Sequence, residues 1–352
     1  MKAERGLLRF HRVRALDPAT AAKLAEHAGG VSLPSIAALD ANVARALAAS
    51  KASIELNGIQ ALPGDVAGAL AAGQAQLTME GLRELTSVPL AQKFSRQPGV
   101  LRFPHVQQLD APIATAISGG AVRLHMPGLR QLTHEGLAAR LGEPGKAADL
   151  PHVEVLNAKV AAGLARGGSN VYLPAVKKLD NETAASLVNH EGALQLSSLQ
   201  DIPPEGLACL LRNQGPLSIG AVQAFGPAGQ PVDKQILQAL SAHKWPVVLG
   251  LNPIPADVAA AIKERQAPVY LDGIQHLTVE LAQSLIGCSC HVYLMRVENV
   301  DNGVAAALVK HRHPMKNATG FVLPVTAKQL FNGPELQQLE KHDSICFGNL
   351  LD

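Results

Sequence analysis

The chain has 352 residues, of which 47% are hydrophobic, 17% charged and only 3% aromatic, so we expect an aliphatic core. The formal net charge of +2 lacks the concentrated basic charge that nucleic acids and anionic membranes attract, and we expect neither as a partner. No signal-peptide pattern and no apolar run of about 18 residues is found, which predicts a cytoplasmic protein, with secretion by a route independent of a signal peptide as the alternative.

An apolar pattern of the form V-x-L-x-x-I-x-x-L recurs along the chain with a period of about 23 residues and defines about fifteen frames. The frames begin at Leu8, Val31, Ile54, Leu77, Leu101, Leu124, Ala148, Val171, Leu194, Leu217, Pro246, Val269, Val292, Phe321 and Ile345. Two intervals are longer, and their extra residues predict loops around 226–231 and 313–320 because both segments are rich in turn-forming residues. The repetition predicts a single repeat domain over residues 1–352.

Each frame predicts a strand, a turn and a helix. Alternation at residues 31–33 indicates a short strand with one buried face, and Asp40 then suits the N-cap of a helix. The corresponding N-cap position holds Asp17, Thr86, Asp110, Thr133, Asn157, Asp180, Thr278 and Asp301. Ala44 and Leu47 begin an apolar helix stripe that recurs in other frames. Because one such unit cannot bury its apolar faces alone, we expect an α/β solenoid, a horseshoe with a concave parallel β-sheet of about fifteen strands and short convex helices.

With this spacing the chain resembles a leucine-rich-repeat protein of the helical-backed type, similar to the cysteine-containing repeats of F-box proteins and to the GALA repeats of plant-pathogen effectors. Those families usually carry Asn or Cys at the buried position after the strand, whereas this chain has aliphatic residues such as Ile36 and Val106. The turns must therefore satisfy their backbone groups by main chain or water. The resemblance implies a protein-binding scaffold, such as a bacterial effector or adaptor, without a cofactor.

No catalytic or phosphate-binding motif accompanies the repeats: H-E-x-x-H, G-x-S-x-G, G-x-x-x-x-G-K-[ST] and G-x-G-x-x-G after a strand are all missing. We therefore expect no enzyme activity in this chain, and any catalytic module to be another chain. Neither terminal repeat shows an obvious polar cap. An alternative function is consequently a structural subunit that self-associates through its terminal repeats.

Cysteine and histidine pairs recur one repeat apart near the C-terminal end. Cys288 and Cys290 precede His311 and His313 by one frame, so the two pairs should stack at the corner between helix and strand. Two thiolates and two imidazoles suit a zinc site, and a metal-dependent enzyme or a zinc-stabilised site is the alternative function. The Cys-x-Cys spacing is shorter than usual for zinc ligands, so we favour no metal, a buried cysteine and solvated histidines.

The tyrosines predict the binding surface. Tyr172, Tyr270 and Tyr293 each occupy the outward position between two buried strand residues. Tyr270 and Tyr293 fall on neighbouring strands, and we expect Trp245 and Arg296 at the border of the surface that they form. Tyrosine and tryptophan dominate binding hot spots, although tyrosine is also common in strands for structural reasons. We expect a protein partner on the concave face, centred on Tyr270 and Tyr293.

A second set of residues is basic. It falls on or beside strands of the N-terminal half and comprises Arg9, His11, Arg102, His105, Arg123, His125 and His152. These residues predict either a strip for an acidic partner or ordinary solvated charge, and Arg102 and His125 are its candidate binding residues.

Overall fold

The computed structural model describes residues 6–145, 147–226, 230–311 and 320–348. The chain forms two compact units, Met1–Gly167 and Gly168–Asp352. In the part of the chain that the structure describes, no helix combines the length and apolarity that a membrane crossing needs. The loops predicted around 226–231 and 313–320 lie largely outside the described residues. The single repeat domain over residues 1–352 stays a prediction.

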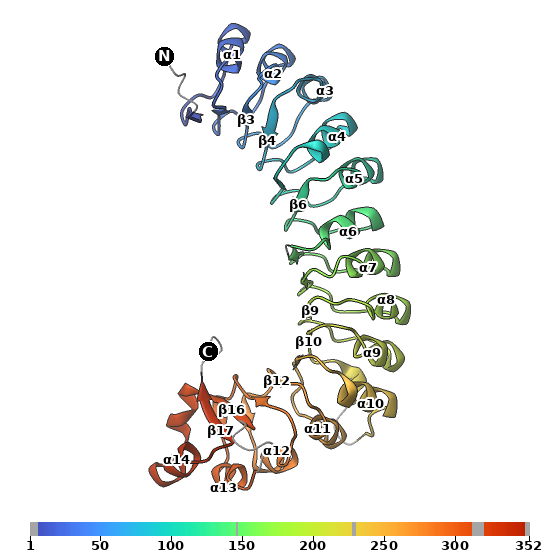
Figure 1. The fold of residues 1–352 in the computed structure, drawn as a ribbon, viewed down its shortest axis with the longest axis vertical. Helices are drawn as coiled ribbons and strands as arrows, with labels where there is room; N and C mark the ends of the chain where they lie inside the picture. The colour runs from blue at the N-terminus through green and yellow to red at the C-terminus, as the bar shows by residue number, and fades with distance from the viewer. Residues whose placement is uncertain (1–5, 146, 227–229, 312–319, 349–352) are drawn as a thin grey trace. The chain divides into compact units, whose positions relative to one another are not determined.

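The first unit alternates strands and helices. Its strands are β1 (Leu8–Arg9), β2 (Val31–Ser32), β3 (Ser53–Glu55), β4 (Gln76–Thr78), β5 (Val100–Arg102), β6 (Arg123–His125) and β7 (Ala148–Asp149). Its helices are α1 (Pro18–Ala25), α2 (Ala41–Ala48), α3 (Gly64–Ala72), α4 (Val88–Arg96), α5 (Ala111–Ser118), α6 (Glu135–Leu141) and α7 (Ala158–Ala165). The helices pack side by side on one side of the strands (Figure 1).

The parallel sheet of the first unit is interrupted between β4 and β5. Strands β1 to β4 pair in order, and β5 pairs with β6. At the break the side chain of Gln97 replaces a strand: Gln97 Oε1 accepts from Leu77 N–H, and Gln97 Nε2 donates to the Leu77 carbonyl at 3.1 Å. The glutamine amide satisfies the edge of β4 with the same donor and acceptor that a neighbouring peptide group would supply.

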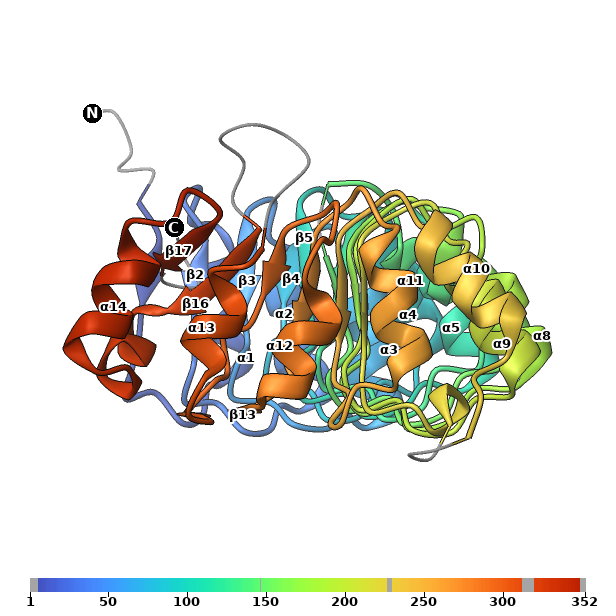
Figure 2. The same ribbon diagram turned by 90° about the horizontal axis from the view of Figure 1, so that it is seen from below.

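The second unit continues the same order of elements. Its strands are β8 (Val171–Tyr172), β9 (Leu194–Leu196), β10 (Leu217–Ile219), β11 (Val247–Leu249), β12 (Val269–Leu271), β13 (His276–Leu277), β14 (Val292–Tyr293), β15 (Asn299–Val300), β16 (Phe321–Pro324) and β17 (Ile345–Gly348). Its α-helices are α8 (Asn181–Ser186), α9 (Pro204–Leu210), α10 (Lys234–Ala242), α11 (Ala256–Lys263), α12 (Val279–Leu285), α13 (Val304–Leu308) and α14 (Gly333–Glu340), with 3₁₀ helices η1 (Gln223–Phe225) and η2 (Val325–Leu330). Figure 2 shows α11, α12, α13 and α14 side by side.

Strand pairing in the second unit is parallel and in register from β8 through β9, β10, β11, β12, β14, β16 and β17, while β13 and β15 form a separate small sheet. Strands and helices alternate with the predicted period, and the predicted α/β solenoid of leucine-rich-repeat type is confirmed. One frame is wrong. Val247 pairs with Leu217 and with Val269, so the frame predicted at Pro246 starts one residue too early.

The core is aliphatic and follows the predicted stripe. In α2, Ala44 and Leu47 are fully buried, as are Val31 of β2 and Leu33 directly after this strand. The buried position after the strand is also apolar, as at Ile36. Burial of these faces between neighbouring repeats is the main contribution to stability, because hydrophobic burial scales with the apolar area removed from water.

Helix starts agree with the predicted acceptors in most repeats. Side chains cap the helix at Asp17, Asp40, Asn157, Asp180 and Thr278. Asp110 stands at the N-cap without a side-chain bond. The predictions at Thr86, Thr133 and Asp301 are wrong, because the N-caps there are Ser87, His134 and Gly303.

Main-chain hydrogen bonds connect the turns that follow the strands. Arg83 N–H donates to the Gln60 carbonyl at 2.9 Å, and Arg130 N–H donates to the Gln107 carbonyl at 2.8 Å. In the second unit Gln200 N–H donates in the same way to the Lys177 carbonyl, one repeat earlier. The turns therefore satisfy these backbone groups through the main chain, as the aliphatic residues after the strands predict.

Candidate binding surfaces

A row of outward side chains crosses the sheet of the second unit. Register pairs Val248 with Tyr270, Tyr270 with Tyr293 and Tyr293 with Val322 on strands β11, β12, β14 and β16. We call these four residues the aromatic row. The rings of Tyr270 and Tyr293 stack with centroids 4.2 Å apart and planes inclined by 14°. The predicted neighbouring tyrosines thus form a single apolar platform whose hydroxyl tips remain polar.

Charged side chains border the aromatic row. Asp272 lies two residues after Tyr270 and is half-buried, and burial raises the pKa of its carboxyl group although Arg296 acts in the opposite direction. Burial likewise raises the pKa of Tyr270, and the neighbouring Tyr293 and Asp272 add to that rise. Arg296 is exposed. The tyrosine hydroxyl therefore stays protonated at neutral pH and is available as a hydrogen-bond donor.

The two other predicted aromatic residues lie elsewhere in the second unit. Tyr172 is on β8, and Gln195, Ser218 and Val248 occupy the outward positions between it and Tyr270. Trp245 is 47% exposed in the turn between α10 and β11, where it lines a pocket of about 240 Å³. The structure thus brings Tyr270 and Tyr293 together and separates Tyr172 from them.

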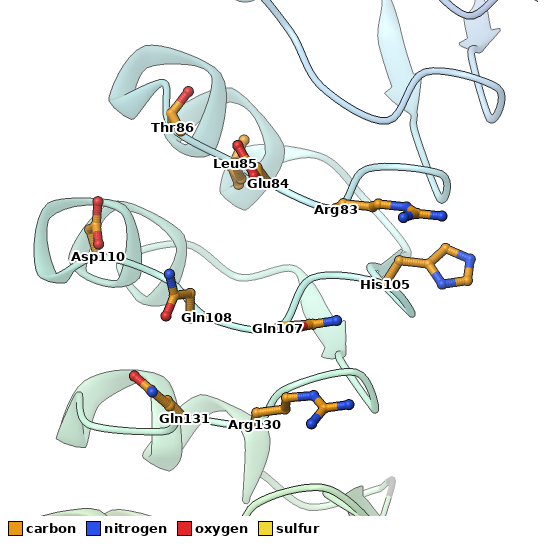
Figure 3. Close-up of a pocket in the computed structure, with 10 residues that line it drawn as sticks. All are labelled: Arg83, Glu84, Leu85, Thr86, His105, Gln107, Gln108, Asp110, Arg130 and Gln131. Atoms are coloured by element: carbon orange, nitrogen blue, oxygen red, sulfur yellow. The ribbon is translucent and has the colours of Figure 1, made fainter.

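Basic side chains gather around β5 and β6 in the first unit. Register places Arg102 beside His125 and Val100 beside Arg123. In the following turns a pocket of about 540 Å³ is lined by Arg83, Glu84, Leu85, Thr86, His105, Gln107, Gln108, Asp110, Arg130 and Gln131. Figure 3 shows the side chains of Arg83, His105, Gln107 and Arg130 pointing to the same side.

Arg83 and Arg130 are absent from the predicted basic strip, yet the repeat frame contains the signal. Gln60, Arg83, Gln107 and Arg130 occupy equivalent turn positions in successive repeats, so arginine alternates with glutamine. Arg102, Arg123, His125 and His105 from the predicted strip lie near them on β5, β6 and their turns.

The remaining members of the predicted strip lie farther along the unit. Arg9 is on β1 and His11 follows it, while β2, β3 and β4 come between them and β5. His152 is exposed in the turn after β7. The predicted strip is therefore divided, and its densest part is at β5 and β6.

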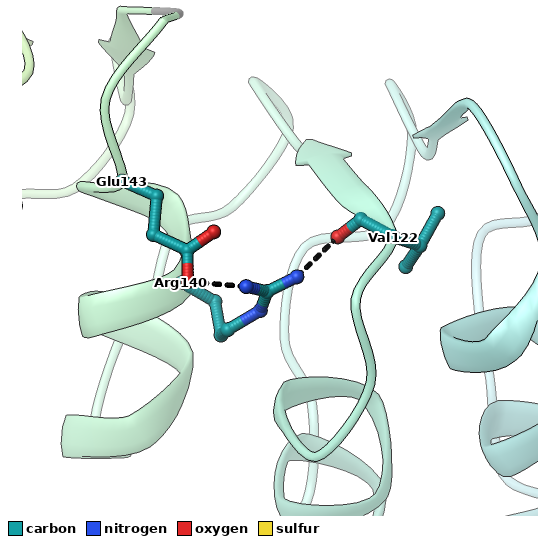
Figure 4. A network of polar contacts seen from close by, with 3 residues as sticks. All are labelled: Val122, Arg140 and Glu143. Carbon is teal, nitrogen blue, oxygen red and sulfur yellow. Dashed lines mark hydrogen bonds and ion pairs between the residues drawn. The ribbon is translucent and has the colours of Figure 1, made fainter.

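Two other arginines of the first unit, Arg140 and Arg166, form ion pairs within the protein. Arg140 on α6 forms an ion pair with Glu143 and donates to the Val122 carbonyl at 2.7 Å (Figure 4). Arg166 forms an ion pair with Glu135 at 2.7 Å. These contacts hold neighbouring repeats together and leave little of either positive charge for a ligand.

A second feature is a column of buried polar side chains at the ends of the helices in the second unit. His190, Asn213, His243, Arg265, Cys288 and His311 are each at most 4% exposed. Each residue also donates its N–H to the carbonyl three positions earlier, at the end of its helix. We call these six residues the corner ladder. From the sequence only Cys288 and His311 were expected at this corner, because the six members share a position and not a residue type.

The Cys/His corner belongs to this ladder. Cys288, Cys290 and His311 are buried, so the expectation of a solvated histidine at His311 is wrong; His313 lies outside the described residues. The thiol of Cys288 donates to the Cys290 carbonyl at 3.3 Å, and that of Cys290 donates to the Ile262 carbonyl at 3.6 Å. His311 Nδ1 accepts from the Gly287 N–H at 3.1 Å. Among the described residues no three His, Cys, Asp or Glu side chains are grouped to hold a metal ion.

Comparison with known proteins gives structural likenesses at low sequence identity. No family model matches the chain, and no curated protein matches its sequence. An internalin from Listeria monocytogenes has 13% identity and a TM-score of 0.43, over 80% of this chain and 78% of the internalin. A leucine-rich-repeat protein from Leptospira interrogans has 15% identity and a TM-score of 0.31, over 90% of this chain and 91% of the other.

Proposed function

We propose that the chain is a non-catalytic protein-binding scaffold and that the aromatic row is its main binding surface. The stack of Tyr270 on Tyr293 carries this proposal. Two large aromatic side chains stand on the outward face of a sheet, half-exposed, in a chain that has only three tyrosines. Aromatic side chains of this kind supply most of the binding energy in protein interfaces.

The environment of the stack suits a protein ligand with both apolar and polar groups. Val248, which is half-buried, extends the apolar area on one side of the rings, and Val322 on the other side is buried. The tyrosine hydroxyls, the carboxyl group of Asp272 and the guanidinium of Arg296 supply polar groups at the edge. An apolar centre with a polar border is the usual composition of a protein interface.

The experiment begins with a pull-down from a lysate of the source organism, followed by calorimetric titration of the purified partner. The Tyr270→Ala, Tyr293→Ala double variant should lose on the order of 1–3 kcal/mol of binding free energy per tyrosine. Tyr172→Ala removes the same side chain from the same sheet and should change the affinity little. Each variant's melting temperature verifies that it folds.

Unchanged affinity of the folded double variant, together with loss of binding from substitutions on the helices, would contradict the proposal. Light scattering at several protein concentrations tests the other candidate role, a structural subunit. A mass that rises with concentration in the absence of a partner would favour that role.

A further inference from the structure

We propose that the first unit carries a second binding surface, which takes an acidic protein segment in extended conformation. Its residues are Arg83, Arg102, His105, Arg123 and Arg130, which we call the basic face. This surface is independent of the aromatic row, because its residues belong to β5, β6 and the neighbouring turns.

The arginines of the basic face are exposed and not engaged within the protein. Arg83, Arg102, Arg123 and Arg130 are all exposed. Among the described residues, none of these four side chains takes part in an ion pair or a hydrogen bond, in contrast to Arg140 and Arg166. Four guanidinium groups on two strands and the adjacent turns therefore retain their positive charge and their donors for a ligand.

The spacing of the basic face fits an extended chain. Neighbouring paired strands lie about 4.8 Å apart, so the turns after β5 and β6 place Gln107 and Arg130 about that far apart, and Arg83 lies on the other side of Gln107, across the break between β4 and β5. Gln107 lies between the two arginines and points to the same side (Figure 3). Carboxylates of a ligand can bind the two guanidinium groups, and the amide between them can bond to a peptide group of the ligand.

Two observations favour an acidic peptide over a nucleic acid. The tyrosines and the tryptophan of the chain all lie in the second unit, and in the first unit Phe94 and Phe103 are fully buried. Phe10 is half-buried but follows β1, away from β5 and β6, so no large exposed aromatic ring lies at the basic face to stack on a base. Glu84 and Asp110 also line the pocket, on the side away from the basic groups (Figure 3). A short peptide can place its few carboxylates on the arginines and avoid Glu84 and Asp110, whereas a phosphate backbone carries a negative charge at every nucleotide.

The test is fluorescence anisotropy with the full chain and a labelled ten-residue peptide of alternating Glu and Ser. At low ionic strength the peptide should bind, and added salt should weaken binding because the attraction is electrostatic. The Arg83→Gln, Arg130→Gln double variant should bind the peptide at least about tenfold more weakly, since each substitution removes one charged contact. The matched control is Arg45→Gln, Arg96→Gln, which removes the same charge from exposed positions on α2 and α4 and should stay within about twofold.

Three outcomes would overturn the proposal: no binding of the acidic peptide to the wild-type chain at low salt, equal loss in the variant and its control, or tighter binding of a ten-nucleotide single strand than of the peptide. The Tyr270→Ala, Tyr293→Ala variant should bind the acidic peptide normally. That result would show that the basic face binds independently of the aromatic row, so the proposal for either surface can be wrong while the other holds.

Discussion

Arg265 Nη2 donates a 2.8 Å hydrogen bond to the carbonyl oxygen of Trp245, in the turn one repeat earlier. A second guanidinium nitrogen of Arg265 donates to the Leu240 carbonyl at the end of α10. The side chain is fully buried, and this burial lowers its pKa to about 10. A buried cation that bonds these two carbonyls connects two repeats, where an aliphatic residue would leave the Trp245 carbonyl without this donor and the Leu240 carbonyl with only the His243 N–H.

Replacing Arg265 by Met should therefore destabilise the protein although methionine fills much of the same volume. Both carbonyls lose the guanidinium donor, and the Leu240 carbonyl keeps only the long bond from the His243 N–H, which costs roughly 2–4 kcal/mol in total. Urea unfolding followed by circular dichroism measures the difference. Arg212→Met, at an exposed position after α9, is the control and should change the free energy of unfolding by less than about 0.5 kcal/mol. Similar small losses in both variants would show that the Arg265 bonds contribute little.

His243 predicts a pH dependence of stability. Burial, with a smaller effect from the nearby Arg265 guanidinium, lowers the pKa of this imidazole from 6.5 to about 4. Its Nδ1 donates to the Leu211 carbonyl at 3.0 Å, a bond that offsets only part of the lowering of the pKa. The unfolded chain binds a proton at this histidine below about pH 6.5, whereas the folded protein binds it only near pH 4. Stability from this group is complete above pH 6.5 and decreases as the pH falls toward 4, by about 3 kcal/mol.

The measurement compares unfolding free energies of the wild type and His243→Gln at pH 7.5 and pH 4.5. Glutamine cannot gain the proton, so the variant should lose less stability between the two pH values than the wild type does. His105, an exposed histidine of the first unit, provides the control His105→Gln, which should follow the wild type. Parallel pH profiles of His243→Gln and the wild type would mean that the imidazole titrates alike in the folded and unfolded chain.

The repeat frame was predictable from sequence because buried and outward residues alternate, but one frame shows where alternation fails. The segment Val247–Leu249 contains three apolar residues in succession after Pro246, so two registers fit the sequence equally well. Pairing of Val247 with Leu217 and Val269 decides between them. Register of this kind depends on the neighbouring strands and not on the segment alone.

The candidate binding residues likewise include some that the sequence predicts and some that only the structure shows. That Tyr270 and Tyr293 are neighbours was predictable from their equivalent positions in adjacent repeats, whereas their stacking is seen only in the structure. Of the corner ladder the sequence predicts only a buried cysteine, because histidine and arginine are normally surface residues and only the packed structure shows them buried. Arg83 and Arg130 were missed because the sequence analysis followed strand positions and not turn positions.

The buried stripe predicts the effect of Leu187→Ala. Leu187 stands at the end of α8 and is 1% exposed, so truncation leaves a cavity in the layer between helices and strands. The expected cost is ~2–5 kcal/mol of unfolding free energy. Lys177→Ala, at an exposed position of the turn before α8, should have little effect. Thermal melts of the two variants provide the measurement, and equal small shifts would contradict the assignment of Leu187 to the core.

The four cysteines predict a graded reactivity toward a thiol reagent. Cys346 is exposed on β17 and Cys209 is half-buried on α9, whereas Cys288 and Cys290 are buried. The hydrogen bond with the Cys290 side chain and burial together raise the pKa of the Cys288 thiol, which disfavours the reactive thiolate. In the native protein at pH 8, Cys346 should react fastest and Cys209 more slowly. Cys288 and Cys290 should react only when the protein unfolds, because burial blocks access to both thiols and thiolate formation is also disfavoured at Cys288.

Peptide mapping after timed labelling identifies which cysteine has reacted, and Cys346→Ser should remove the fastest phase while leaving the slower ones unchanged.

The same experiment separates the two interpretations of the Cys/His corner. If packing alone protects Cys288 and Cys290, a chelator should not alter their labelling in the native protein. If zinc protects them, the chelator should release stoichiometric metal and make both thiols react faster, because metal binding holds thiolates that become nucleophilic once the ion leaves. Both sulfurs contact carbonyl oxygens, and no third His, Cys, Asp or Glu side chain of the described residues is grouped with them to hold a metal ion, so we expect the chelator to have no effect.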